Sequence, residues 1–91
     1  MTRTPVFLTA TAQHILRHLH SDLKRSLRRA LDELAKHQTA GKPLQEELAG
    51  LWTLRVVHYR LIYQVDETGI TVIFLGPRRT VYERLREMLL K

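Results

Sequence analysis

The spacing of apolar residues changes character near residue 50. Before that point apolar side chains recur every three or four positions, which is the period of an amphipathic helix. The longest such stripe predicts a helix over residues 22–37, which the breakers in TAGKP (39–43) end. A shorter stripe predicts a preceding helix, capped by Thr9 or Thr11 and built on Ala12, Ile15, Leu16 and Leu19. A short apolar run over residues 5–8 predicts a strand ahead of both helices.

After residue 50 the apolar residues form short continuous runs. The runs at 51–57, 59–65 and 70–75 are rich in the β-branched and aromatic residues that strands prefer. The DETG sequence at 66–69 predicts a hairpin loop, and the tight connections predict an antiparallel meander. The last twelve residues predict a short helix or an extended tail. The order β-α-α-β-β-β-α predicts a single α+β domain over 1–91, with two N-terminal helices packed on one face of a small antiparallel sheet.

Strand alternation gives the two faces of that sheet different characters. Tyr59, Leu61 and Tyr63 fall on the side that the helices would cover. His58 and Arg60 fall on the other side, which Thr53 and Arg55 share from the preceding run. The run at 70–75 is apolar on both sides, as expected of a central strand. The second face is therefore half apolar and half cationic, which predicts either a binding groove or a surface that a partner closes.

Charge supports an anionic partner. Fifteen Lys and Arg oppose nine Asp and Glu, giving a net charge of +6, and eleven of the fifteen are arginine. Arginine matches phosphate oxygens with two parallel donors, so the bias favours a polyanion or an acidic protein, with a solvated basic surface as the alternative. Arg78 and Arg79 follow the last strand and precede Tyr82. A second basic set lies on one helix, either as a solvated face or as a set of phosphate contacts: Lys24, Arg25, Arg28 and Arg29.

Several classes of protein and site fit the sequence poorly. It has no cysteine, its first residues lack a signal-peptide core, and no apolar run approaches the length of a membrane span. We therefore expect a soluble cytoplasmic protein with no membrane association. His14 and His18 have a spacing that can hold a metal, but no third ligand is evident, so we expect neither a metal nor another cofactor.

The strand region also resembles a known protein family. The order and spacing of Arg55, Tyr59-Arg60, Tyr63, Gly76, Arg78-Arg79 and Tyr82 are similar to the core signature of the RelE/ParE superfamily, the toxins of type II toxin–antitoxin systems. The resemblance extends over nearly the whole chain. It implies two helices on a small antiparallel sheet, as in microbial ribonucleases. It also implies one of two activities, metal-independent cleavage of mRNA on the ribosome in the RelE branch or inhibition of DNA gyrase in the ParE branch. In both branches an acidic antitoxin neutralises the toxin.

By the same resemblance, Arg60 and Arg78 stabilise charge on the scissile phosphate, and Tyr82 stacks on a substrate base. Arg55 and Arg79, together with the basic helix, would contact RNA or the ribosome. Leu51 and Thr53 occupy positions where the RelE branch commonly has lysines, so the usual proton acceptor is missing. Because His58 is expected beside Arg60, it is a candidate for that role. We favour a ribosome-dependent mRNA endoribonuclease, with a gyrase inhibitor or a catalytically decayed antitoxin-binding protein as alternatives.

Overall fold

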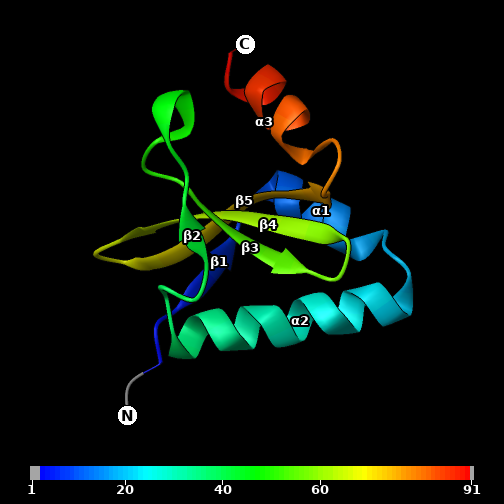
Figure 1. Ribbon diagram of the computed structural model, residues 1–91. Helices are drawn as coiled ribbons and strands as arrows, with labels where there is room; N and C mark the ends of the chain where they lie inside the picture. The colour runs from blue at the N-terminus through cyan, green and yellow to red at the C-terminus, as the bar shows by residue number, and fades with distance from the viewer. Residues whose placement is uncertain (1–2, 91) are drawn as a thin grey trace.

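The computed structural model describes residues 3–90 and has three helices and one mixed sheet (Figure 1). Strand β1 (Val6–Leu8) leads into α1 (Ala10–Arg17), which the Thr9 side chain caps by accepting a hydrogen bond from the Ala12 amide. Helix α2 (Ser21–Lys36) follows, within one residue of the expected bounds. The predicted α+β class is thereby confirmed. No helix within residues 3–90 is both long and apolar enough to cross a membrane.

The sheet has five strands in the order β1-β5-β4-β3-β2. The expected meander is antiparallel and consists of β3 (Trp52–Val56), β4 (Tyr59–Asp66) and β5 (Gly69–Pro77). A two-residue strand, β2 (Lys42–Pro43), and a 3-10 turn, η1 (Glu46–Leu48), precede it. Contrary to the expectation of an antiparallel sheet, β1 pairs with β5 in parallel. The helices carry the chain to the far edge of the sheet, and three antiparallel strands then bring β5 back beside β1 in the same direction.

Helices α1 and α2 cover one face of the sheet, as Figure 1 shows for α2. The apolar stripes of both helices pack against the side chains that β3, β4 and β5 present on this face. The buried members of this core are Ala12, Leu27, Leu34, Val56, Leu61, Tyr63, Ile70, Val72 and Leu75.

Helix α3 (Val81–Leu89) lies on the opposite face. Val81 and Leu85 are fully buried there against Ile62 and Phe74, with Leu48 of η1 completing a second, smaller core. An ion pair ties α3 to η1, with 2.6 Å between Arg86 Nε and Glu47 Oε1. The apolar half of the second face is thus closed by the chain itself, and its cationic half stays open.

A β-bulge sets which side chains of β5 face α3. Ile62 pairs with Phe74 but Tyr63 pairs with Val72, so Ile73 is the extra residue in β5. The bulge reverses the alternation, so that Val72 and Leu75 both face the α1–α2 core while Phe74 packs under α3. Gly76 is consequently on the α3 side, directly opposite Arg60.

Tyr63 belongs to the core and holds the loop after α2. Its buried hydroxyl donates to the Gln38 carbonyl and accepts from the Gly41 amide, each at 3.1 Å. Burial raises the pKa of this phenol, against a smaller opposing effect of the Gly41 hydrogen bond. A Cβ at Gly41 would lie 2.4 Å from the Thr53 carbonyl oxygen, so only glycine fits this approach. Tyr63 belongs to the motif that resembles the RelE/ParE superfamily, but these contacts give it a structural role.

Candidate nucleic-acid interface

Arg60 is the centre of the open cationic surface. It lies on β4 between Arg55 of β3 and Gly76 of β5, its direct cross-strand neighbours. Its guanidinium carbon lies 5.8 Å from the centroid of the Tyr82 ring, within the range of a cation–π contact. Its Nε is buried and has no hydrogen-bond partner. A buried donor without a partner is unfavourable, so the chain holds Arg60 in this place at a cost in stability.

The charge around Arg60 is uncompensated. Arg55 and Arg60 face each other across two strands, an arrangement that like charges disfavour. The ion pairs formed among residues 3–90 involve other cations, namely Arg3, Arg25 and Arg86. The open half of the face therefore presents a positive potential that an external anion would relieve.

Tyr82 reaches the surface from the first turn of α3. Its hydroxyl is hydrogen-bonded to Thr53 Oγ1 at 3.3 Å, and its ring is half-buried beside Arg60. Leu51 packs with the core beneath α3. The two positions that carry lysines in the RelE branch thus hold an apolar side chain and a buried hydroxyl here, and neither can accept a proton near neutral pH.

Arg78 and Arg79 lie in the turn between β5 and α3. The Arg78 amide donates to the His58 carbonyl at 2.8 Å, which ties this turn to the connection between β3 and β4. Both arginine side chains are exposed. Because Gly76 is paired with Arg60 two residues earlier, the two arginines extend the cationic surface beyond the end of the strands.

The expectation that His58 shares a face with Arg60 is wrong. Residues 57 and 58 form a two-residue turn, so the alternation of β4 begins only at Tyr59. The His58 ring packs edge-on against Tyr59 at 5.2 Å and lines a cavity with residues of the α1–α2 corner, including His18 and Leu23. Val57 in this turn adopts a φ of 57°, which is rare for a β-branched residue, so the turn carries no ordinary signal in the sequence.

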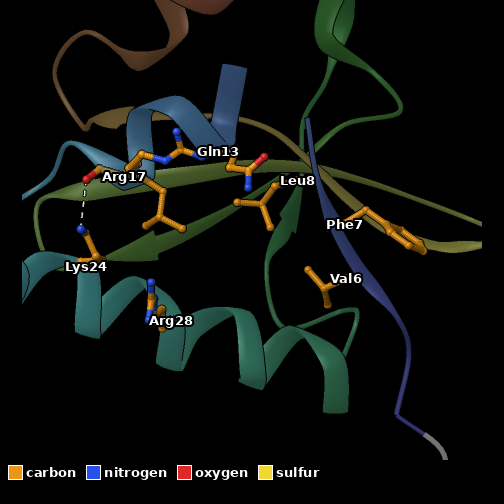
Figure 2. A pocket seen from close by; sticks show the side chains of 8 residues that line it. Val6, Phe7, Leu8, Gln13, Arg17, Lys24 and Arg28 are labelled. Carbon is orange, nitrogen blue, oxygen red and sulfur yellow. Dashed lines mark hydrogen bonds between the residues drawn. The ribbon is translucent and has the colours of Figure 1, made fainter. Parts of the chain in front are cut away.

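The basic residues predicted on α2 lie on the other side of the sheet and divide into two groups. Lys24 and Arg28 line a groove of about 480 Å³ between β1, α1 and α2, together with Arg17 (Figure 2). We call this the β1 groove; its apolar lining comprises Val6, Phe7, Leu8 and Leu16. Lys24 Nζ donates to the Arg17 carbonyl at 3.0 Å, and no carboxylate lines the groove. Arg25 is paired with Asp22 at 3.5 Å, and Arg29 is exposed.

Sequence reasoning missed Arg17 and the β1 groove because only the tertiary fold brings α1 beside α2 and the edge strand. The His14 and His18 rings are 4.4 Å apart, as their spacing predicts. Across residues 3–90 no three His, Cys, Asp or Glu side chains gather as a metal site would require.

Comparison with known proteins gives a consistent result. Residues 6–82 match the family described as the ParE toxin of the type II toxin–antitoxin system parDE. Toxin RelG of Mycobacterium tuberculosis is 44% identical over 46 residues, which is 48% of this chain and 53% of that toxin, so the match spans about half the length of this relative.

Two solved structures show the same fold. The RelBE2 toxin–antitoxin complex of M. tuberculosis matches with a TM-score of 0.77 at 29% identity, covering 86% of this chain and 94% of that one. The isolated E. coli RelE toxin matches with a TM-score of 0.69 at 22% identity, covering 94% and 98%. The chain therefore belongs to the ParE toxin family of type II toxin–antitoxin systems, within the RelE/ParE superfamily.

Proposed function

We propose that this toxin is a ribosome-dependent mRNA endoribonuclease. The observation that carries the proposal is the pairing of Arg60, whose buried Nε lacks a partner, with the ring of Tyr82 on a surface of uncompensated arginines. A phosphate can pair with the exposed part of the Arg60 guanidinium, and an unpaired base supplies a partner for the aromatic ring. Single-stranded RNA offers both groups within one nucleotide.

The reaction that suits this surface is attack by a ribose 2′-hydroxyl on the adjacent phosphodiester. The 2′-oxygen forms a bond to phosphorus, the 5′-oxygen of the next nucleotide leaves, and a 2′,3′-cyclic phosphate results. Negative charge develops on the non-bridging oxygens, where Arg60 and Arg78 stabilise it. Arg55 and Arg79 would hold neighbouring phosphates, which fixes the register of the strand. Tyr82 would hold the base and so align the 2′-hydroxyl with the leaving group.

The reaction needs a group that accepts the proton of the attacking 2′-hydroxyl. Among residues 3–90 Arg60 forms no ion pair with a carboxylate, and the hydroxyl of Tyr82 bonds to Thr53, which cannot accept a proton near neutral pH. A role for His58 remains a prediction, since its ring packs on Tyr59 and not beside Arg60. Replacing His58 with glutamine tests it. A pH–rate profile whose acidic limb is lost in this variant would assign the proton transfer to the imidazole.

The basic residues of α2 and the β1 groove beside them suit two partners, which would bind at different times. Arg25 and Arg29, with Lys24 and Arg28 on the same helix, would contact phosphates of ribosomal RNA in a salt-dependent manner. The β1 groove combines an apolar lining with cations and without acids, which fits an acidic antitoxin segment carrying apolar anchors. Similar toxins have been solved in complex with their antitoxins, among them RelBE2 of M. tuberculosis. An antitoxin bound in the β1 groove would mask Lys24 and Arg28 and so oppose ribosome binding.

A second candidate function is inhibition of DNA gyrase without catalysis. The match to the ParE toxin family and the absence of lysine at positions 51 and 53 both favour it. Under this alternative the same arginines would bind the enzyme or its DNA, and Arg60 would contribute affinity without affecting a chemical step.

One experiment separates the two candidates. The toxin is induced in cells, mRNA 5′ ends are mapped, and DNA breaks are scored in the same culture. We expect new mRNA ends in phase with codons, which disappear in Arg60→Ala and Arg78→Ala. DNA breaks with intact mRNA would overturn the endoribonuclease and establish the gyrase inhibitor.

A further inference from the structure

We propose that Thr53 is a positioning residue that fixes the orientation of Tyr82; this inference rests on the proposed endoribonuclease and deepens it. Thr53 is buried, at 7% exposure, and among residues 3–90 it shares with Tyr63 the unusual property of a hydroxyl inside the protein. It lies on β3 beneath α3, where valine would have nearly the same shape and no polar atom to desolvate. A buried hydroxyl at this place needs a reason, because burying a polar group is unfavourable unless a hydrogen bond compensates it.

The reason is the contact with Tyr82. The phenol is 3.3 Å from Thr53 Oγ1, a bond that spans from the middle of the sheet to the first turn of α3. Thr53 is itself immobile, because the ladders place it opposite Lys42 on one side and Ile62 on the other. The hydrogen bond therefore transfers the rigidity of the sheet to a side chain on a helix that otherwise meets the sheet through apolar contacts.

Two attachments then define the plane of the Tyr82 ring. The hydroxyl is fixed by Thr53, and the ring lies 5.8 Å from the Arg60 guanidinium. An aromatic ring with a defined plane is a better platform for a base than one that turns freely, since alignment of the 2′-hydroxyl depends on where the base is held. Thr53 is too buried to touch RNA, so it acts only through Tyr82.

A hydroxyl at this position has a further consequence for charge. It orients the phenol without adding a cation, so the positive charge of the surface comes from arginine alone. The surface accordingly relies on geometry at Tyr82 and on charge at Arg60, Arg55 and Arg78. Loss of either should lower the cleavage rate by a different route.

The test compares Thr53→Val, which keeps the shape, with Thr53→Ser, which keeps the hydroxyl. Thr71→Val is the matched control, because Thr71 lies on β5 opposite Phe7 and Gln64, away from Tyr82. Cleavage of ribosome-bound mRNA is measured under single-turnover conditions, and the melting temperature is measured alongside. We expect Thr53→Val to lower the maximal rate roughly 10- to 100-fold with little change in the toxin concentration for half-saturation, and Thr53→Ser to restore most of it.

A second readout does not depend on catalysis. In the ribosome-free toxin, the ring resonances of isotope-labelled Tyr82 should shift in Thr53→Val and not in Thr71→Val. A shift in a toxin whose wild type cleaves no RNA would support the positioning role and overturn the proposed function. If the wild type cleaves RNA while Thr53→Val is fully active with unshifted Tyr82 resonances, the proposed function is supported and the positioning role is overturned. A Thr53→Ser variant that is stable and as slow as Thr53→Val would also overturn the positioning role.

Discussion

The two faces of the sheet differ in how completely the chain covers them. On one face α1, α2 and the strands together form a core of nine buried residues, and the strands present an almost purely apolar surface to the helices. On the other face α3, η1 and the strands form a core of five, and the covering stops where the strands carry Arg55 and Arg60. The first face stabilises the fold. The second is left incomplete at the place where a ligand would bind, so the functional surface is the part of the sheet that the protein does not cover.

The two basic surfaces differ in the same way. In the β1 groove Lys24 is satisfied by the Arg17 carbonyl, and its neighbours are free to reach a partner from the rim. On the α3 side Arg60 has a buried donor without a partner and a second arginine directly opposite. Rim charges of the first kind steer association, whereas a half-buried guanidinium of the second kind, held in place by the sheet, can stabilise charge in a reaction.

The largest effects should come from weakening each face in turn. Leu27→Ala and Leu85→Ala each remove a fully buried side chain and should lower the free energy of unfolding by about 2–5 kcal/mol. At a temperature where both variants remain folded, only Leu85→Ala should slow RNA cleavage, by up to about 100-fold, because α3 carries Tyr82. Denaturant unfolding and single-turnover cleavage measure the two quantities. Equal activity in both variants would contradict the assignment of stability to one face and of catalysis to the other.

A smaller loss of stability is expected at the loop that Tyr63 holds. Tyr63→Phe leaves the Gly41 amide and the Gln38 carbonyl without their partner and should cost about 1–3 kcal/mol, with cleavage unchanged. Tyr59→Phe is the control. Because burial raises the pKa of Tyr63 above its ordinary value of 10.0, the neutral phenol favours the folded state below pH 10, and this contribution disappears as the pH rises further. Unfolding curves for wild type and Tyr63→Phe that converge above pH 10 would agree with this sign, and parallel curves would not.

The β1 groove should show a different sensitivity. Arg17→Glu should weaken binding of the co-expressed cognate antitoxin about tenfold, more strongly at low salt, and leave the rate of RNA cleavage at saturating ribosome concentration unchanged. Lys36→Glu, a charge reversal at the far end of α2, is the matched control. Calorimetric titration measures the affinity. If the two reversals have the same effect, the groove is not the antitoxin site.

The smallest effect is expected at the strained turn between β3 and β4. Val57 has a φ of 57° and is 62% exposed, so Val57→Gly relieves backbone strain while it removes little buried surface. We expect a gain of about 0.5–1 kcal/mol in thermal unfolding. A loss of that size, as glycine causes in a regular strand, would show that the turn is not strained.

The sequence was most informative where a single periodicity ran without interruption. The stripe of leucines located α2 to within one residue, and alternation placed Arg55, Arg60 and Thr53 on one face because β3 and β4 are regular over those positions. His58 was misplaced because a tight turn with a β-branched residue at positive φ has no ordinary sequence signal.

The remaining differences arise from tertiary structure. The bulge at Ile73, the parallel pairing of β1 and the β1 groove all depend on which segments meet, and local patterns do not encode that. The Thr53 hydroxyl could be noted in sequence only as a missing lysine, since its partner is 29 positions away.

The most direct test of the central claim is the rate at which purified toxin cleaves ribosome-bound mRNA when one arginine is removed from the open face. Arg60→Ala should lower the single-turnover rate by about 10²–10³-fold, because it removes a fixed cation from the developing phosphorane. Arg3→Ala removes an exposed arginine whose partner is Asp32, on the far side of the molecule from α3, and should leave the rate within about twofold of wild type. Equal rates for Arg60→Ala, Arg3→Ala and the wild-type toxin would contradict the assignment of catalysis to this face.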